Sequence, residues 1–167
     1  MRNIYTILTL VLALALGACD GKRIVATPPE AAEAGADLSA IVAKATDVML
    51  AAYKAGQVPA TVADPFFKAV DERVLPLSRR AKTAVAAWNA ATEGAPKIKA
   101  GEDLKALLAD LEREAKLVFG VTLPAGVGAS IGNIASDLYD AIAKIRAVIA
   151  QARAGLVVQP ALAAVEN

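Results

Sequence analysis

The stretch that decides the fold is IGNIASDLYDAIAKIRAVIAQA, residues 131–152. Its apolar side chains recur at alternating spacings of three and four residues, which places them on one face of an α-helix. Because the repeat continues over three heptads, it is typical of a helix that packs against other helices. We expect a helix over residues 131–155 that ends at Gly155. The apolar face consists of Ile131, Ile134, Leu138, Ala141, Ile145, Val148 and Ala152.

Two other stretches predict helices with similar apolar faces. One begins at Asp37 and ends at Gly56, although the capping box Thr27-Pro-Pro-Glu30 allows an earlier start. The other covers residues 102–119 and ends at Gly120. The face of the first consists of Leu38, Ile41, Val42, Ala45, Val48, Met49 and Ala52, and that of the second of Leu104, Leu107, Leu108, Leu111, Ala115 and Val118.

A fourth helix is expected between Asp64 and Gly94, with Asp64 as N-cap and Pro65 in the first turn. Its apolar face continues across Pro76. A proline at that position lacks a backbone donor and clashes with the preceding turn, so we expect a kink or two shorter helices that meet near Leu75. The predicted face consists of Val70, Val74, Leu77, Ala81, Ala84 and Trp88, and Trp88 is therefore predicted to lie in the core.

The composition agrees with a helical protein of one domain. The chain has 167 residues, of which 56% are hydrophobic but only 4% aromatic, and β-branched residues rarely alternate with polar ones as strands require. Amphipathic helices joined by short linkers can bury their apolar faces only against one another. The predicted fold is all-α, an antiparallel bundle of four helices, or five if one divides at Pro76, over residues 37–155.

The charges and the missing histidine argue against several functions. Lys and Arg total 18 and Asp and Glu total 17, so removal of residues 1–18, which contain only Arg2, leaves 17 of each sign. Such a balance provides no field that attracts nucleic acid. Histidine, the commonest general base and metal ligand, does not occur in the sequence. We therefore predict neither a nucleic-acid partner nor a bound metal.

No pattern in the sequence predicts catalysis or a cofactor. The acid pairs Asp71-Glu72, Glu102-Asp103 and Asp137/Asp140 are expected to face solvent or helix N-termini, not a cleft. The serines have no histidine to activate them, and GVGASIG lacks the lysine and preceding strand of a phosphate-binding loop. We predict no catalytic residue, no cofactor and no enzymatic activity.

The N-terminus has the features of a secretory signal peptide. A positive start at Arg2 precedes the apolar run IYTILTLVLALAL, residues 4–16, and small residues follow at Gly17 and Ala18. A membrane-spanning helix needs about 20 apolar residues, and this run is shorter. We therefore predict that residues 1–18 are removed.

The only cysteine stands directly after this segment. Leu16-Gly17-Ala18-Cys19 resembles the lipobox of bacterial lipoproteins. The resemblance implies that the Cys19 sulfur receives a diacylglycerol, that the chain is cut before Cys19, and that the new N-terminus is acylated with a fatty acid such as palmitate. Asp20 is similar to the signal that keeps enteric lipoproteins in the inner membrane, so we favour that membrane, with the outer membrane as the alternative.

The segments that flank the predicted bundle carry no function of their own. Residues 19–36 contain prolines and glycines without a sustained apolar face, which predicts a lipidated tether. Residues 156–167 are predicted to be a C-terminal tail that covers a bundle end or frays.

Residues 117–136 are uncharged and rich in glycine, which raises the question of contact with lipid. Pro124, Asn133 and four glycines argue against a membrane span. We expect a glycine-rich turn followed by a helix with Ser130 or a neighbour as its cap. The alternative is a mobile apolar loop over residues 120–130 that contacts lipid or a partner protein.

Together these features predict a bacterial envelope lipoprotein, held at the membrane through acylated Cys19 and facing the periplasm. Its bundle is expected to act as a non-catalytic protein-interaction or structural module with an envelope protein as partner. The alternative is a periplasmic carrier that holds a lipid or another hydrophobic ligand in an apolar cavity lined by Ala84, Ala141 and their neighbours.

Overall fold

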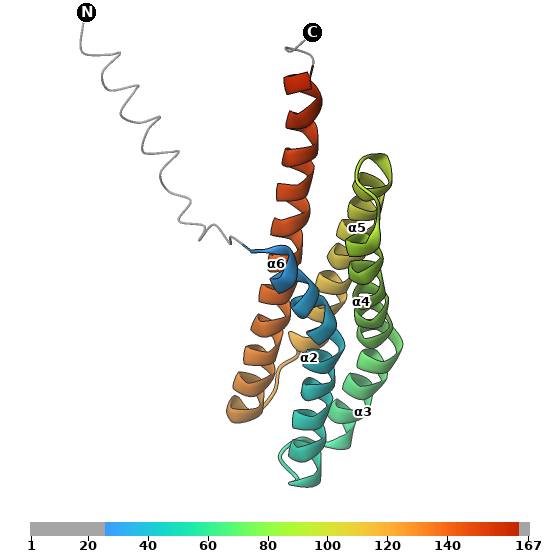
Figure 1. The fold of residues 1–167 in the computed structure, drawn as a ribbon. Helices are drawn as coiled ribbons and strands as arrows, with labels where there is room; N and C mark the ends of the chain where they lie inside the picture. Colours follow the sequence, from blue (N-terminus) through green and yellow to red (C-terminus); the bar gives the residue numbers. More distant parts are fainter. Residues whose placement is uncertain (1–25, 164–167) are drawn as a thin grey trace, which may run out of the picture.

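The predicted all-α bundle is confirmed in the computed structural model, which describes residues 26–163 and their side chains as far as Ala154. Four helical arms alternate in direction along the chain (Figure 1). Helix α2 packs against α4 and α6, and α5 packs against the same two helices, so the arms enclose one core. The arms are α2 (Pro28–Lys54); α3 (Ala60–Ala69), the π-helix η1 (Val70–Val74) and α4 (Leu75–Ala90) as one arm; α5 (Ala95–Phe119); and α6 (Ala125–Ala163).

The apolar face of residues 131–152 lies in the core, as its periodicity predicts. Ile131, Leu138 and Ile145 are fully buried, and Ala152 at the end of the face is partly buried. Facing positions on α2 and α5 are filled by Leu38, Met49, Leu104, Leu108 and Leu111, all without exposed surface.

The first helix begins earlier than the main prediction, and this corrects the extent of the tether. Helix α2 begins at Pro28, directly after Thr27, because the Thr27–Glu30 capping box forms: the Thr27 backbone N–H and hydroxyl both donate to Glu30 Oε2, at 2.6 and 2.8 Å. These bonds hold the pKa of the Glu30 carboxyl below its usual value. Ala31, Ala34 and Gly35 are buried, so residues 28–36 belong to the bundle and not to a tether.

The second arm also begins earlier, at Ala60 after the N-cap Pro59, so the predicted N-cap at Asp64 is wrong. Pro65 lies inside α3. The predicted break before Pro76 takes the form of the π-helix η1, after which Pro76 lies in the first turn of α4.

The spacing of the buried residues along this arm explains why the π-helix forms. Phe66, Val70, Val74 and Ser78 are buried at three successive intervals of four. In a regular α-helix such intervals drift around the axis, and the wider π turn returns them to one face. After η1 the predicted face is confirmed at Ala81 and Trp88, which are buried. Ser78 and Val85 are buried in place of Leu77 and Ala84, which are only partly buried.

The last two helices are longer than predicted, α5 at its start alone and α6 at both ends. Helix α5 begins at Ala95 after Gly94, which has a φ of +94°. Helix α6 begins at Ala125, so Ser130 is no cap: its hydroxyl donates to the Gly126 carbonyl oxygen at 3.1 Å, one turn back within the helix. The predicted end at Gly155 is wrong, because the helix continues through this residue. A glycine weakens a helix by about 1 kcal/mol, but it keeps its backbone N–H donor and does not have to end the helix. Residues 156–163, predicted as a tail, are thus helical.

Candidate functional site

Cys19 and Asp20, the predicted lipid attachment and sorting residues, lie outside the described residues. The chain joins the bundle at Ala26, which is buried, and Thr27, the N-cap of α2. An extended chain spans at most about 3.5 Å per residue, so Cys19 is within about 30 Å of Thr27. A lipid on Cys19 would therefore hold the start of α2 close to the bilayer.

The antiparallel arms give the bundle two ends. The proximal end contains the start of α2, the turn between α4 and α5, and the C-terminal part of α6. The distal end contains the end of α2, the start of α3 and the start of α6, whereas α5 ends at about half the height of α2, and residues 120–124 continue from there toward the distal end (Figure 1). A helix of 27 residues such as α2 is about 40 Å long, so the distal end lies far from the point where the chain enters.

The large exposed apolar side chains lie at the ends of α2 and α5, the two helices that run toward the distal end. Leu50 and Tyr53, 37% and 40% exposed, lie in the last two turns of α2. Leu117, 59% exposed, lies in the last turn of α5, and Val121, 40% exposed, follows it. We call these four residues the distal apolar set. No other large hydrophobic side chain among the described residues is as exposed.

An open groove lies between α2 and the start of α6 at the same end, with a volume of about 720 Å³. Its walls are mainly small or apolar. They consist of Val48, Ala51, Ala52, Ala55, Gln57, Pro124, Gly126, Val127 and Ser130.

The distal apolar set was not identified from the sequence, although a signal was present. Leu50 and Tyr53 are large apolar residues that fall between the core positions of their helix, and Leu117 does so in α5. A large apolar side chain off the buried face is exposed by geometry alone.

A short turn joins α5 to α6, as expected, instead of the alternative loop over residues 120–130. Helix α5 ends at Phe119 and α6 begins at Ala125, so only residues 120–124 connect them. Burial explains most of the large apolar residues within the uncharged stretch, since Val118, Phe119, Val127, Ile131 and Ile134 lie in the core. None of the described helices is long and apolar enough to cross a membrane.

The acid pairs do not converge on an enclosed site. Asp71 and Glu72 are exposed on η1, and Asp103 pairs with Lys99 one turn away at 3.2 Å. Asp137 and Asp140 are exposed and line an open groove between α2 and α6 that also contains Glu30, Glu33, Asp37 and Lys144. Among the described residues, no group of three or more acidic, cysteine or histidine side chains is arranged to hold a metal ion.

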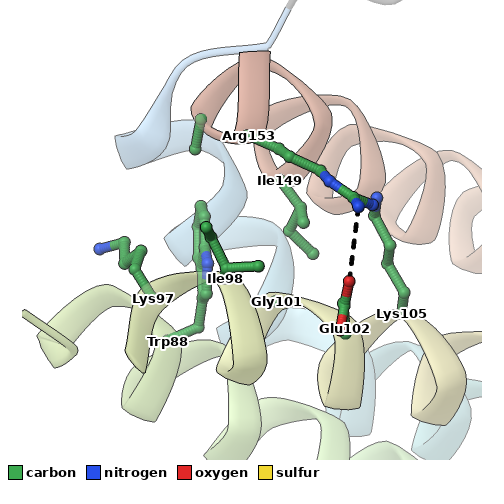
Figure 2. Close-up of a pocket in the computed structure, with 9 residues that line it drawn as sticks. Trp88, Lys97, Ile98, Gly101, Glu102, Lys105, Ile149 and Arg153 are labelled. Carbon is green, nitrogen blue, oxygen red and sulfur yellow. Dashed lines mark ion pairs between the residues drawn. The ribbon is translucent and has the colours of Figure 1, made fainter. Parts of the chain in front are cut away.

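Trp88 lies in the core near the proximal end, as predicted, and is 3% exposed. It borders a cavity of about 10 Å³, which is the space of a single water molecule (Figure 2). Lys97 Nζ lies 4.9 Å from the indole centroid, and Arg153 forms an ion pair of 3.6 Å with Glu102 at the rim (Figure 2).

The alanines that a carrier would use do not form a common cavity wall. Ala141 lines the open acidic groove between α2 and α6, whereas Ala84 on α4 packs against the core. The space between the helices is filled by leucine, isoleucine, methionine and Trp88.

A charged cluster joins α5 to α6. Glu112 accepts hydrogen bonds from Lys116 Nζ and Arg146 Nη1, both at 2.6 Å, and Arg146 is on the other helix. The bond from Lys116, followed by that from Arg146, holds the pKa of the Glu112 carboxyl below its usual value. Arg73 on η1 similarly reaches Glu114 on α5 at 2.5 Å.

Comparison of the chain with protein-family models, with curated proteins and with solved structures finds no match in any of the three.

Proposed function

We propose that this protein is a membrane-anchored envelope lipoprotein whose helical bundle presents a protein-binding surface at its distal end. The observation that carries the proposal is the position of the distal apolar set. The tether joins the bundle at the opposite end, so a lipid on Cys19 would leave the distal set facing the periplasm, where another envelope protein can reach it.

Exposed leucine and tyrosine side chains are suited to this role. Tyrosine and other large apolar side chains supply contact area at low conformational cost, and groups of them on a surface mark interaction sites. The lipid would strengthen binding to a membrane partner without a new contact, because confinement beside the membrane raises the effective concentration of the bundle toward that partner.

The anchor is tested by intact mass of the protein extracted from membranes. We expect cleavage before Cys19 and the added mass of a diacylglycerol and a fatty acyl chain. Cys19→Ser should yield an uncleaved or a soluble form, since without the cysteine the chain receives neither the diacylglycerol nor the third acyl chain that hold it at the membrane. A cleaved variant that stays in the membrane as completely as the unsubstituted protein would show that Cys19 is not the main anchor.

The binding surface is tested by photo-crosslinking in intact cells. A photoreactive residue at Leu117 should form a defined crosslinked product, whereas the same residue at Ala86, an exposed position on α4 toward the proximal end, should not. Equal crosslinking at both positions would argue against a distal binding surface.

A further inference from the structure

The C-terminal part of α6 leaves the bundle at the proximal end. The last residues of α6 with described contacts to other helices are Ala152 and Arg153, which lie beside Trp88 and Glu102. Beyond them Figure 1 shows the backbone of α6, in red, extending past both the start of α2 and the turn between α4 and α5. We call residues 154–163 the α6 extension.

The sequence of the extension changes where the helix leaves the bundle. Within the bundle α6 carries charged residues such as Asp137, Lys144 and Arg153 on its outer side. After Arg153 no Asp, Glu, Lys or Arg occurs until Glu166, and the intervening sequence is AGLVVQPALAAV. A helix that projects alone into water is normally polar on all sides, whereas one without charges needs an apolar environment.

Its position determines which apolar environment is within reach. Pro28 and Pro29 at the start of α2 lie beside Gln151 and Ala152 of α6, so the tether enters where the extension departs. Cys19 is within about 30 Å of Thr27, and ten helical residues extend about 15 Å from the same end. A bilayer that holds the lipid of Cys19 is therefore the apolar phase closest to the extension.

We propose that the α6 extension inserts into the surface of the bilayer as a second attachment, beside the lipidated N-terminus. It covers about half of the 30 Å hydrocarbon core, so it enters one leaflet and does not cross. Two attachments at one end hold the long axis of the bundle away from the membrane and point the distal apolar set into the periplasm. The inference rests on the proposed lipid anchor.

The test uses the full acylated chain in vesicles of phosphatidylethanolamine and phosphatidylglycerol. A polarity-sensitive thiol dye is attached through Val157→Cys in the extension or through Lys54→Cys at the distal end of α2, and quenching by spin-labelled acyl chains and by aqueous iodide is measured. Acylated Cys19 has no free thiol, so it takes no dye. Dye at position 157 should lose most of its emission to the lipid quencher, and dye at position 54 should lose it to iodide.

A second variant and the mass spectrum separate the possible failures. Leu156→Glu with Leu162→Glu, added to Val157→Cys, should abolish the lipid quenching while the circular dichroism of the bundle is retained. Dye at position 157 that is quenched by iodide alone, or by neither agent because protein covers it, overturns the inference and leaves the lipid anchor standing. A mass without acyl chains, accompanied by dye on Cys19, overturns the anchor and the inference together.

Discussion

At the scale of single residues, glycines set how closely the helices approach. A Cβ on Gly35 of α2 would lie 2.7 Å from Val85 Cγ1 of α4, which is nearer than such atoms can pack. Gly132 of α6, in contrast, has no atom within 4 Å of the same position. Two helical glycines of one chain therefore predict opposite effects of the same substitution.

Gly35→Ala should lower the free energy of unfolding by about 1–3 kcal/mol, since α2 and α4 must move apart. Gly132→Ala should raise it by up to about 1 kcal/mol, because alanine loses less conformational entropy in a helix. Equilibrium urea unfolding followed by circular dichroism measures both. A change of the same sign in the two variants would contradict the close packing of α2 on α4.

The Glu112 cluster predicts a contribution to stability that depends on pH. Because the folded state lowers the pKa of this carboxyl, its contribution is present above the unfolded pKa of about 4.3 and is lost as the pH falls through the lower folded value. Glu112→Gln should therefore cost about 0.5–1 kcal/mol near pH 7 and flatten the loss of stability below pH 5.

The matched control for Glu112 is Glu93→Gln, an exposed carboxylate in the turn between α4 and α5. It should leave the unfolding free energy unchanged at both pH values. If the two variants had the same pH profile, the link between α5 and α6 through Arg146 would not contribute to stability.

At the scale of helices, the buried faces could be predicted from the sequence but several helix ends could not. The repeat of residues 131–152 is a property of side chains that all face the core, so periodicity alone identifies it. The position of a helix end depends instead on whether the residues there adopt the helix or the linker conformation. Pro59, Pro96 and Gly94 can each serve as a linker residue or as a helix start, and only the packing of the following turn decides between them.

The π-helix is a second feature that only the whole arm explains. Three intervals of four between buried residues fit one face only if the helix widens locally, and Pro76 adds a reason for the break because its ring clashes with the carbonyl four residues earlier. The prediction assumed a uniform α-helix, and it was therefore wrong by one position at Leu77 and Ala84, although Ala81 and Trp88 are buried as predicted.

Removal of one residue from η1 should therefore convert it to a regular α-helix. Deletion of the exposed Asp71, combined with Pro76→Ala to remove the clash, should leave a folded bundle with a cooperative transition. Deletion of the exposed Ala86 in α4 should instead turn Trp88 out of the core and cost about 3–5 kcal/mol. Circular dichroism and urea unfolding distinguish the two deletions. Equal destabilisation would mean that η1 does not contain one residue more than a regular α-helix needs at this place.

At the scale of the whole molecule, the sequence predicts the helices, but only the antiparallel fold shows which helix ends lie close together. Leu50 and Tyr53 are far from Leu117 and Val121 in sequence, and both pairs lie toward the same side of the bundle only because α2 and α5 run in the same direction within it. The same arrangement brings the end of α6 to the start of α2. The proposed functions of the two ends therefore depend on topology, not on any single motif.

The last prediction asks whether the distal apolar set is exposed for binding and not for folding. Leu117 is the most exposed member, so Leu117→Lys should change the unfolding free energy by no more than about 0.5 kcal/mol. The same substitution should reduce crosslinking from a photoreactive residue at Tyr53 at least severalfold, because a charge introduced into an apolar contact must be desolvated without a partner. Ala86→Lys on α4 should affect neither quantity. Retained crosslinking in the Leu117 variant would remove Leu117 from the binding surface, and marked destabilisation would assign it to the fold.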